Sequence, residues 1–183
     1  MEKISVTIQG TTPILFNRFR DTAIEGKSKK RTGAMSESDI NDKLYLDDKG
    51  NVQLPAVYLK NSITEAGKQF KITGKGKSTY SKLIASTIDI EPFYIDLDSK
   101  KYEVFRISAV NPMTKGRMMT ERPRFNEWKA SFEIIVNDPQ VPTSVVNEVL
   151  EHAGKYVGIG DWRPQTKGMF GKFMITSFKI QKQ

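Results

Sequence analysis

Hydrophobic and polar residues alternate along five segments of the chain, and this period of two predicts β-strands with one buried face. The segments are 4–8, 87–97, 103–110, 128–136 and 172–180. Pro92 lies inside the second segment, and because proline cannot donate a ladder hydrogen bond, we expect a bulge or a sheet edge there. Two shorter strands, at 44–46 and 52–54, are expected to flank the turn sequence Asp48-Lys-Gly-Asn.

Two other segments carry apolar residues at steps of three and four, which predicts amphipathic helices. The first begins with Pro55 at its first helical position and runs to about Gln69, and the second is opened by Pro142. The apolar stripes are Leu59, Ile63, Ala66 and Phe70 in the first helix, and Val146, Val149, Leu150 and Ala153 in the second. A further helical turn is expected at 82–86.

The resulting order is strand, helix, paired strands, helix, strand, which is the β-α-β-β-α-β order of a ferredoxin-like α+β fold. A chain of 183 residues has the length of one domain, so we predict a single ferredoxin-like domain over 1–183. Two insertions decorate it. Residues 17–50, after the first strand, lack a sustained period and are expected to be exposed, and residues 111–126 interrupt the central strand region.

The chain is basic, with 29 Lys and Arg against 21 Asp and Glu and a formal net charge of +8. Basic residues cluster at 27–31, 66–86, 115–124 and 155–182. Acidic residues concentrate at 37–48 and 91–103. Such segregation predicts a basic face and an acidic face, and a basic face is typical of proteins that bind nucleic acid.

Other classes of protein are excluded by composition. The chain has no cysteine, which excludes a disulfide framework, a thiol nucleophile and a cysteine zinc site. A single histidine cannot build a multi-histidine metal centre, so we expect no metal and no cofactor. No apolar run approaches the length of a membrane span, and the N-terminus has an amphipathic strand pattern rather than that of a signal peptide. We therefore expect a cytoplasmic protein.

The segment Gly158–Phe173 is rich in glycine and joins the second helix to the last strand. Glycine allows a backbone to approach a ligand and to adopt positive φ, and successive loop N–H groups can bind an anion. The segment adds positive charge at Arg163 and Lys167 and flat rings at Trp162 and Phe170. This combination favours binding of a sugar-phosphate backbone with exposed bases. The alternative is a tight turn whose glycines serve only the fold.

Three features together resemble the RAMP superfamily, the RRM-like nucleic-acid-binding proteins of CRISPR effector complexes, and their phage or prophage relatives. The first is Gly158-Ile-Gly160, a spacer with basic residues, and then Gly168-Met-Phe-Gly171, one residue longer than the family's closing Gly-x-Gly. The second is Leu54-Pro-Ala-Val-Tyr-Leu-Lys-Asn-Ser-Ile63, similar to the segment that opens the first helix of backbone-type members, with Ala56 and Asn61 in place of glycines. The third is the basic insertion, which resembles the thumb of those subunits.

In the basic insertion, four cations alternate with apolar side chains, which suits phosphates and bases respectively. The alternative is a solvated hairpin. Arginines that flank an aromatic residue after the first strand, and lysines in the loop at 71–81, are further phosphate candidates, although that loop could equally be solubilising. The expected nucleic-acid-binding residues are Arg18, Arg20, Lys60, Lys75, Lys77, Lys115, Arg117, Met118, Met119, Arg122, Arg124, Gly158, Gly160, Trp162, Arg163, Lys167, Gly168 and Gly171.

We predict a protein that is not an enzyme. It would bind single-stranded RNA or DNA without sequence preference, as a homo-oligomer assembling head to tail along the strand or as a subunit of a larger complex. Two alternatives stay open. One is a RAMP-type endoribonuclease, for which His152 and Asp21 are the candidate catalytic residues. The other is a protein–protein module that mimics or inhibits a CRISPR-type nuclease complex.

Overall fold

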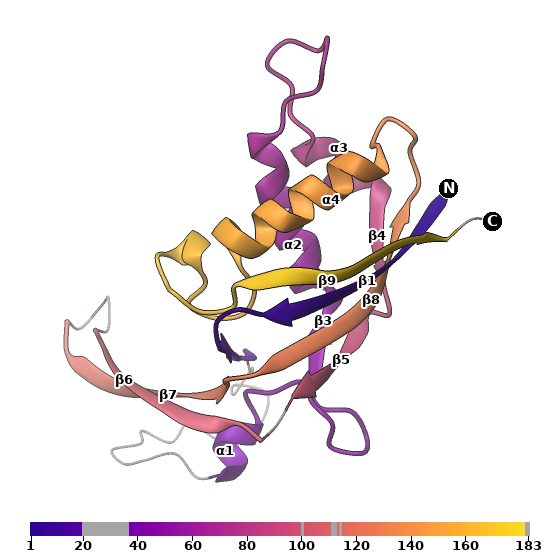
Figure 1. The fold of residues 1–183 in the computed structure, drawn as a ribbon. Coiled ribbons are helices and arrows are strands. Elements are labelled where there is room, and N and C mark those ends of the chain that lie inside the picture. Colours follow the sequence, from indigo (N-terminus) through magenta and orange to yellow (C-terminus); the bar gives the residue numbers. More distant parts are fainter. Residues whose placement is uncertain (20–36, 100, 111–112, 114, 182–183) are drawn as a thin grey trace.

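The computed structural model describes residues 1–19, 37–99, 101–110, 113 and 115–181. Its larger sheet contains β1 Glu2–Gly10, β3 Gln53–Pro55, β4 Ile88–Glu91, β5 Tyr94–Ser99, β8 Trp128–Val136 and β9 Phe173–Gln181. The order is β3-β5-β8-β1-β9, with β4 also paired to β8, and all of these pairs are antiparallel. The first and last strands of the chain therefore lie side by side (Figure 1).

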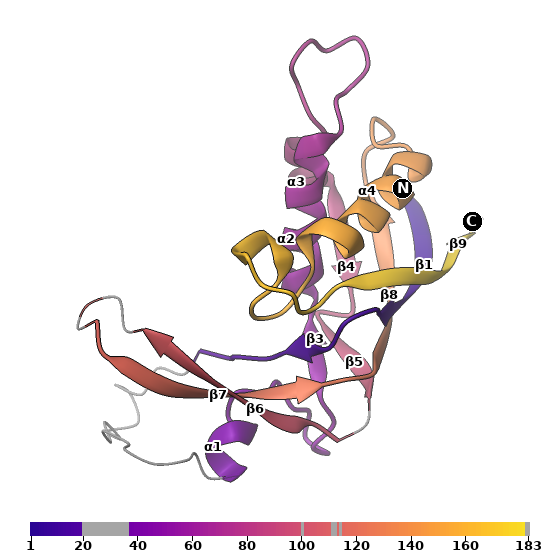
Figure 2. The ribbon, with the colours of Figure 1, turned by 60° about the vertical axis from the view of Figure 1, so that its left-hand side comes forward.

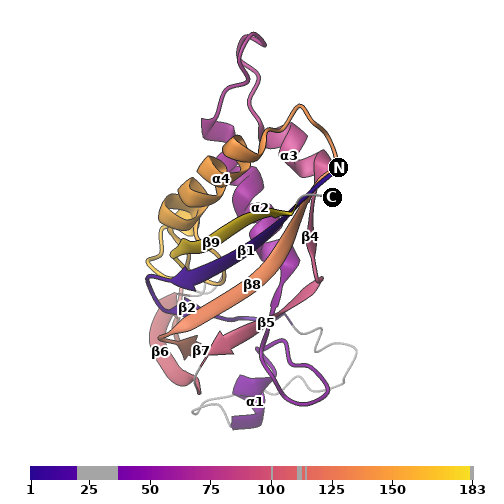
Figure 3. The same cartoon turned by 45° about the vertical axis from the view of Figure 1, so that its right-hand side comes forward.

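Helices cover one face of this sheet (Figure 1, Figure 3). They are α2 Ala56–Ala66, continued by a 3₁₀ turn at Gly67–Gln69, α3 Ser81–Thr87, and α4 Thr143–His152, continued by a π turn at Ala153–Val157. The predicted stripes are confirmed as core, with Leu59, Ile63, Ala66, Val146, Val149, Leu150 and Ala153 buried and Phe70 half-buried. Pro55 is the N-cap of α2 rather than its first helical residue, so the helix begins at Ala56, one residue later than predicted.

The alternation along the central strands explains the two faces of the sheet. Ile4, Val6 and Ile8 on β1 are buried beneath the helices. The residues between them point the other way, and Thr7 lies opposite Ser131 of β8 with their hydroxyl oxygens 3.0 Å apart. One face of β1 and β8 is thus apolar and covered, and the other is polar and open.

A second sheet projects from the first (Figure 1, Figure 2). It contains β2 Ile14–Leu15, β6 Glu103–Val110 and β7 Arg117–Phe125, in the order β2-β7-β6. The segment predicted as a strand at 103–110 is β6, which pairs with β7, whereas β5 pairs with β8. The predicted central insertion, 111–126, corresponds to part of a longer hairpin. The projecting hairpin begins at Glu103, and its second arm is a regular strand that accommodates Pro123.

The segment predicted at 87–97 is divided into β4 and β5 by Pro92 and Phe93, as expected for a proline at that point. The insertion at 17–50 is not wholly exposed. Its short helix α1, Glu37–Asn41, and the turn after it bury Ile40 and Leu44. The predicted turn at 48–51 is confirmed and is closed by the Asp47 carboxylate, which accepts from the Asn51 amide. Arg20, Asp21 and the basic cluster at 27–31 lie outside the described residues.

No helix within the described ranges is long and apolar enough to cross a membrane.

The Leu59→Ala substitution tests the role of α2 in the core. Leu59 is fully buried, so we expect the free energy of unfolding to fall by about 2–5 kcal/mol. Thermal melting should register this as a drop of roughly 2–4 °C for each kcal/mol. Asn61→Ala, on the exposed side of the same helix, is the control and should change stability by no more than about 0.5 kcal/mol. Equal effects of the two substitutions would contradict the assigned core face.

Candidate nucleic-acid interface

The glycine-rich loop, residues 158–172, folds tightly upon itself. Gly158, Gly160 and Gly171 have φ angles of 72°, 82° and 71°, a region that favours glycine. A Cβ at Gly171 would lie 1.7 Å from the carbonyl oxygen of Ile159, and one at Gly168 would lie 1.7 Å from that of Trp162. The loop therefore needs its glycines for its own packing, whether or not a ligand is bound.

Several amides of this loop bond to the protein. Asp161 N–H donates to the carbonyl of Leu15 (2.9 Å), and Gly171 N–H donates to that of Pro13 (2.8 Å). Ile159, Gly168 and Phe170 also donate their N–H groups to backbone carbonyls of the loop. These amides are not available to an anion, so the interpretation of the loop as a backbone anion site is wrong for them. Arg163 and Lys167 remain its cationic candidates.

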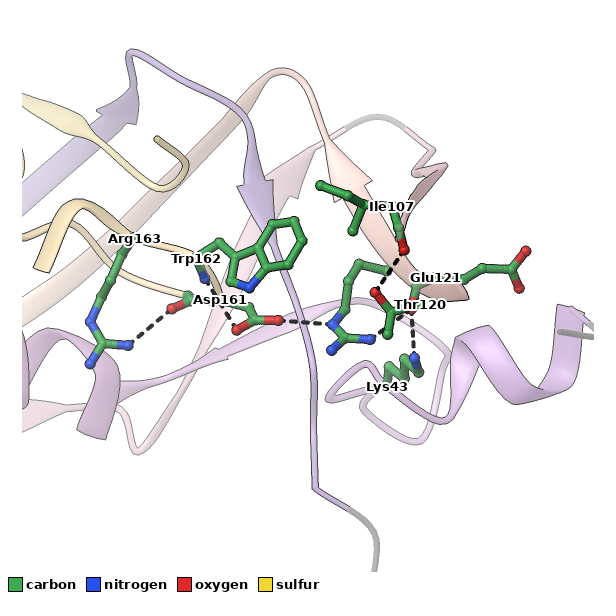
Figure 4. Close-up of polar contacts among 9 residues, drawn as sticks. Lys43, Ile107, Thr120, Glu121, Asp161, Trp162 and Arg163 are labelled. Carbon is green, nitrogen blue, oxygen red and sulfur yellow. Dashed lines mark hydrogen bonds and ion pairs between the residues drawn. The ribbon is translucent and has the colours of Figure 1, made fainter. Parts of the chain in front are cut away.

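One face of the hairpin packs on this loop. Arg122 Nε lies 2.8 Å from Asp161 Oδ2, with the two side chains 15% and 26% exposed (Figure 4). Phe105, opposite Arg122 on β6, contacts Trp162 and Phe170 edge-on, with ring centroids 6.2 and 5.2 Å apart. Trp162 therefore anchors the loop against the hairpin, and Arg122 holds the two together.

The remaining arginines at the base of the hairpin are also paired. Arg106 Nε lies 2.6 Å from Glu121 Oε1, and Arg124 Nη2 lies 2.5 Å from Glu103 Oε2. Glu121 is only 2% exposed, and its carbonyl accepts from the Lys43 ammonium at 2.5 Å (Figure 4). Arg122 and Arg124, both expected to bind nucleic acid, are thus engaged by carboxylates of this chain.

The distal half of the hairpin has a different character. Between Ile107 and Thr120 the sequence contains no Asp or Glu. Lys115 and Arg117 are exposed there, and Met119 is 65% exposed. The Met118 side chain lies outside what the structure describes, although its backbone pairs with β6. Positive charge and an exposed apolar side chain are therefore presented at the far end of the hairpin.

The structure separates the other candidates. Lys60 donates from its ammonium to the carbonyls of Ile84 and Ile88, so it ties α2 to α3 and β4, and burial lowers its pKa. Lys75 and Lys77 are exposed in the loop at 71–80, at the opposite end of the molecule from the hairpin (Figure 2). Arg18 is exposed near the glycine-rich loop and lies over Tyr45.

Of the two catalytic candidates, His152 lies within the described residues. His152 lies on α4 between the rings of Phe70 and Tyr156, with centroid distances of 5.6 and 4.7 Å, and its Nδ1 is buried without a hydrogen-bond partner. Asp21 is outside the described ranges. Among the residues that the structure does describe, no group of three or more His, Asp or Glu side chains could hold a metal ion.

The sequence did not indicate that Phe105 and Lys43 belong to this site. It also did not indicate that Asp161 and Glu103 pair with Arg122 and Arg124. The alternation along β6 marked Phe105 as one side of a strand, but not as a contact of the glycine-rich loop. Lys43 comes from a segment without a regular pattern. Burial, and secondarily the charge of Arg122, lower the pKa of the Lys43 ammonium to about 8. No spacing in the sequence indicates that these segments meet.

No protein-family model matches the sequence, and no curated protein is significantly similar to it. Among solved structures, the chain resembles one from the cryo-EM structure of the Type III-B Cmr-beta bound to cognate target RNA, with a TM-score of 0.62 and 12% identity over 99% of this chain. This chain covers 61% of that chain's length. Cmr6 from Pyrococcus furiosus has a TM-score of 0.44 at 10% identity, with 94% and 97% of the two chains covered. The first likeness is one of fold, in line with the resemblance found in the sequence.

Two glycine substitutions test what the loop requires. Gly171→Ala should destabilise the protein strongly, because the new Cβ meets the carbonyl of Ile159. Gly74→Ala is matched to it, since φ is similar at +77° but no atom lies within 4 Å of the added Cβ, and should cost only about 1–2 kcal/mol. Urea unfolding measures both. If the two variants lose the same stability, packing within the loop is not what demands Gly171.

Lys43 should leave a signature in the pH dependence of stability. Its pKa is about 8 in the folded protein and 10.5 as the ordinary value, so between these pH values the unfolded chain binds more protons at this group. The contribution of Lys43 to stability therefore rises with pH across this window. Urea unfolding of Lys43→Met should lack that rise, whereas Lys49→Met, at an exposed site, should follow the wild type. Parallel curves for all three proteins would contradict the burial of the Lys43 ammonium.

Proposed function

We propose that this protein binds single-stranded nucleic acid through phosphates and base stacking, without sequence preference, as a RAMP-like domain. The observation that carries the proposal is the distribution of charge along the projecting hairpin. Its basal arginines are neutralised by carboxylates of the same chain, whereas Lys115 and Arg117 stand on a distal half that contains no Asp or Glu. Exposed cations on a projecting ribbon suit a polyanion.

The anchoring of the hairpin supports this proposal. An ion pair and edge-on rings hold its base to the glycine-rich loop, and Lys43 donates to the Glu121 carbonyl, which Arg122 also contacts. A hairpin fixed at its base can present its distal cations in one orientation, so little conformational freedom is lost when a ligand binds. The basal arginines thus position the binding residues rather than serving as the principal phosphate contacts.

The open face of the larger sheet offers a weaker surface for nucleic acid. On the central strands β1 and β8 it carries two lysines, several small hydroxyls and one carboxylate, namely Lys3, Lys129, Ser5, Thr7, Ser131 and Glu133. On this face β1 and β8 present no ring on which a base could stack, and Glu133 pairs with Lys3 at 2.9 Å. We therefore assign binding to the hairpin and the glycine-rich loop rather than to the sheet.

The fold supports the same class of function. The antiparallel order β9-β1-β8-β5, with α2 and α4 on one face, is the arrangement we assign to a single ferredoxin-like domain. A chain of similar fold occurs in Cmr-beta bound to cognate target RNA, which favours RNA as the ligand to be tested first. The proposal includes head-to-tail assembly of copies along one strand. It includes no catalytic step.

Removing the two distal cations tests the proposal. We expect Lys115→Ala with Arg117→Ala to weaken binding to single-stranded RNA of any sequence by about tenfold or more, since a charge-assisted hydrogen bond is worth roughly 1.5–3 kcal/mol. The slope of log affinity against log salt should flatten by about 1.4, or roughly 0.7 for each lost contact. Fluorescence anisotropy over a series of salt concentrations measures both quantities, and the thermal melt should be unchanged because both residues are exposed.

A second pair of substitutions controls for net charge. Lys129→Ala with Lys179→Ala removes two exposed lysines from the open face of the larger sheet. This pair should leave affinity and salt slope nearly unchanged. If both pairs weaken binding equally, the protein attracts nucleic acid only through its total charge, and the hairpin is not the binding element.

A further inference from the structure

A row of four aromatic rings crosses the surface between the glycine-rich loop and the corner that joins β4 to β5. The rings of Phe93 and Tyr94 have centroids 4.9 Å apart. Tyr94 and Tyr45 follow at 6.2 Å, and Tyr45 and Tyr58 at 6.1 Å. These residues come from three segments, namely the β4–β5 corner, the turn before β3 and the first turn of α2. We call them the aromatic row.

The outer members of the aromatic row contribute little to the core. Phe93 is 64% exposed and Tyr94 is 46% exposed. Tyr45 and Tyr58 are half-buried and pack against the core, so they form a firm base for the outer pair. Contiguous exposed rings of this size are typical of binding surfaces, because their apolar area is left in contact with water unless a partner covers it.

A cation accompanies the rings. The guanidinium carbon of Arg18 lies 5.3 Å from the centre of the Tyr45 ring, and its backbone N–H donates to the Lys43 carbonyl at 2.9 Å, which holds the segment in place. At the inner end, the charges of Asp161 and Arg163 both act on the Tyr58 hydroxyl. The aromatic row therefore passes under Arg18.

Burial, reinforced by the hydrogen bond with Tyr45, raises the pKa of Tyr58 above its ordinary range, so its hydroxyl stays neutral. A series of rings with a guanidinium beside it offers two kinds of contact to a single-stranded nucleic acid. Flat faces can stack bases, and a fixed cation can meet a phosphate.

We infer that the aromatic row stacks bases of the nucleic acid that the hairpin holds. This inference rests on the proposed function and extends it, since it adds Phe93, Tyr94 and Tyr45 to the binding surface and pairs them with Arg18. The strand runs from the hairpin past the glycine-rich loop and Arg163 to the β4–β5 corner. Bases, rather than the phosphates alone, then contribute to affinity, and they do so without sequence preference because every base presents a flat face.

A strand without bases separates stacking from charge. Affinity is measured for single-stranded RNA and for an abasic strand of the same length, using wild type and Phe93→Ala with Tyr94→Ala. Wild type should prefer the strand with bases, and the double variant should lose that preference by about fivefold or more for each stacked base, with unchanged affinity for the abasic strand. Phe93→Tyr and Tyr94→Phe keep the rings and should bind as wild type.

Tyr156→Ala is the matched control, because Tyr156 is 65% exposed but lies at the end of α4, outside the aromatic row. It should leave both affinities unchanged. If the wild type binds neither strand, the proposed function fails and the inference fails with it. If the wild type binds and the Phe93 and Tyr94 double variant keeps the full preference for bases, the inference alone is overturned. An equal loss toward both strands would also overturn it, since it would indicate a contact with protein or a packing role.

Discussion

The backbone of residues 13–16 is the structural link on which the candidate interface depends. Ile14, Leu15 and Phe16 are fully buried, so their polar backbone groups must be bonded within the protein. On one side, the carbonyls of Pro13 and Leu15 accept from the glycine-rich loop. On the other, Phe16 N–H donates to Pro123 of β7. A single extended segment thus fixes both the loop and the hairpin, and it brings Arg122 to Asp161.

This link explains why charge near the hairpin divides into two roles. Close to β2, arginines are partly buried and require carboxylates, because an unpaired buried charge is costly. Farther along the hairpin, Lys115 and Arg117 are exposed, so water can solvate their charges. The same strand therefore carries arginines that hold the structure together and cations that are available to a ligand. The sequence pattern does not distinguish among Lys115, Arg117, Arg122 and Arg124 as phosphate contacts. Their environments do, because Arg122 and Arg124 are paired with carboxylates.

Much of the fold could be predicted from hydrophobic periodicity, because the strands and helices of the larger sheet bury one regular face each. Ile4, Val6 and Ile8 and the stripe of α2 are examples. In the second sheet the alternation predicted β6 but not β7, because β7 contains Pro123 and charged residues on both faces. The two-residue β2 is too short to show a pattern. The glycine-rich loop was identified, but the reason for its glycines, contact with its own carbonyls, depends on distances that no spacing encodes.

The positions of the basic clusters constrain how one strand could meet this protein. The hairpin and the glycine-rich loop lie together on one side of the molecule, whereas the loop with Lys75 and Lys77 lies at the other end (Figure 1, Figure 2). A short ligand that occupies the first side does not reach the second. The distant lysines therefore have a role in binding only if the strand continues beyond one copy, where it meets the next. The proposed binding mode is therefore connected to head-to-tail assembly, because Lys75 and Lys77 can contact the strand only where it passes to the next copy of the protein.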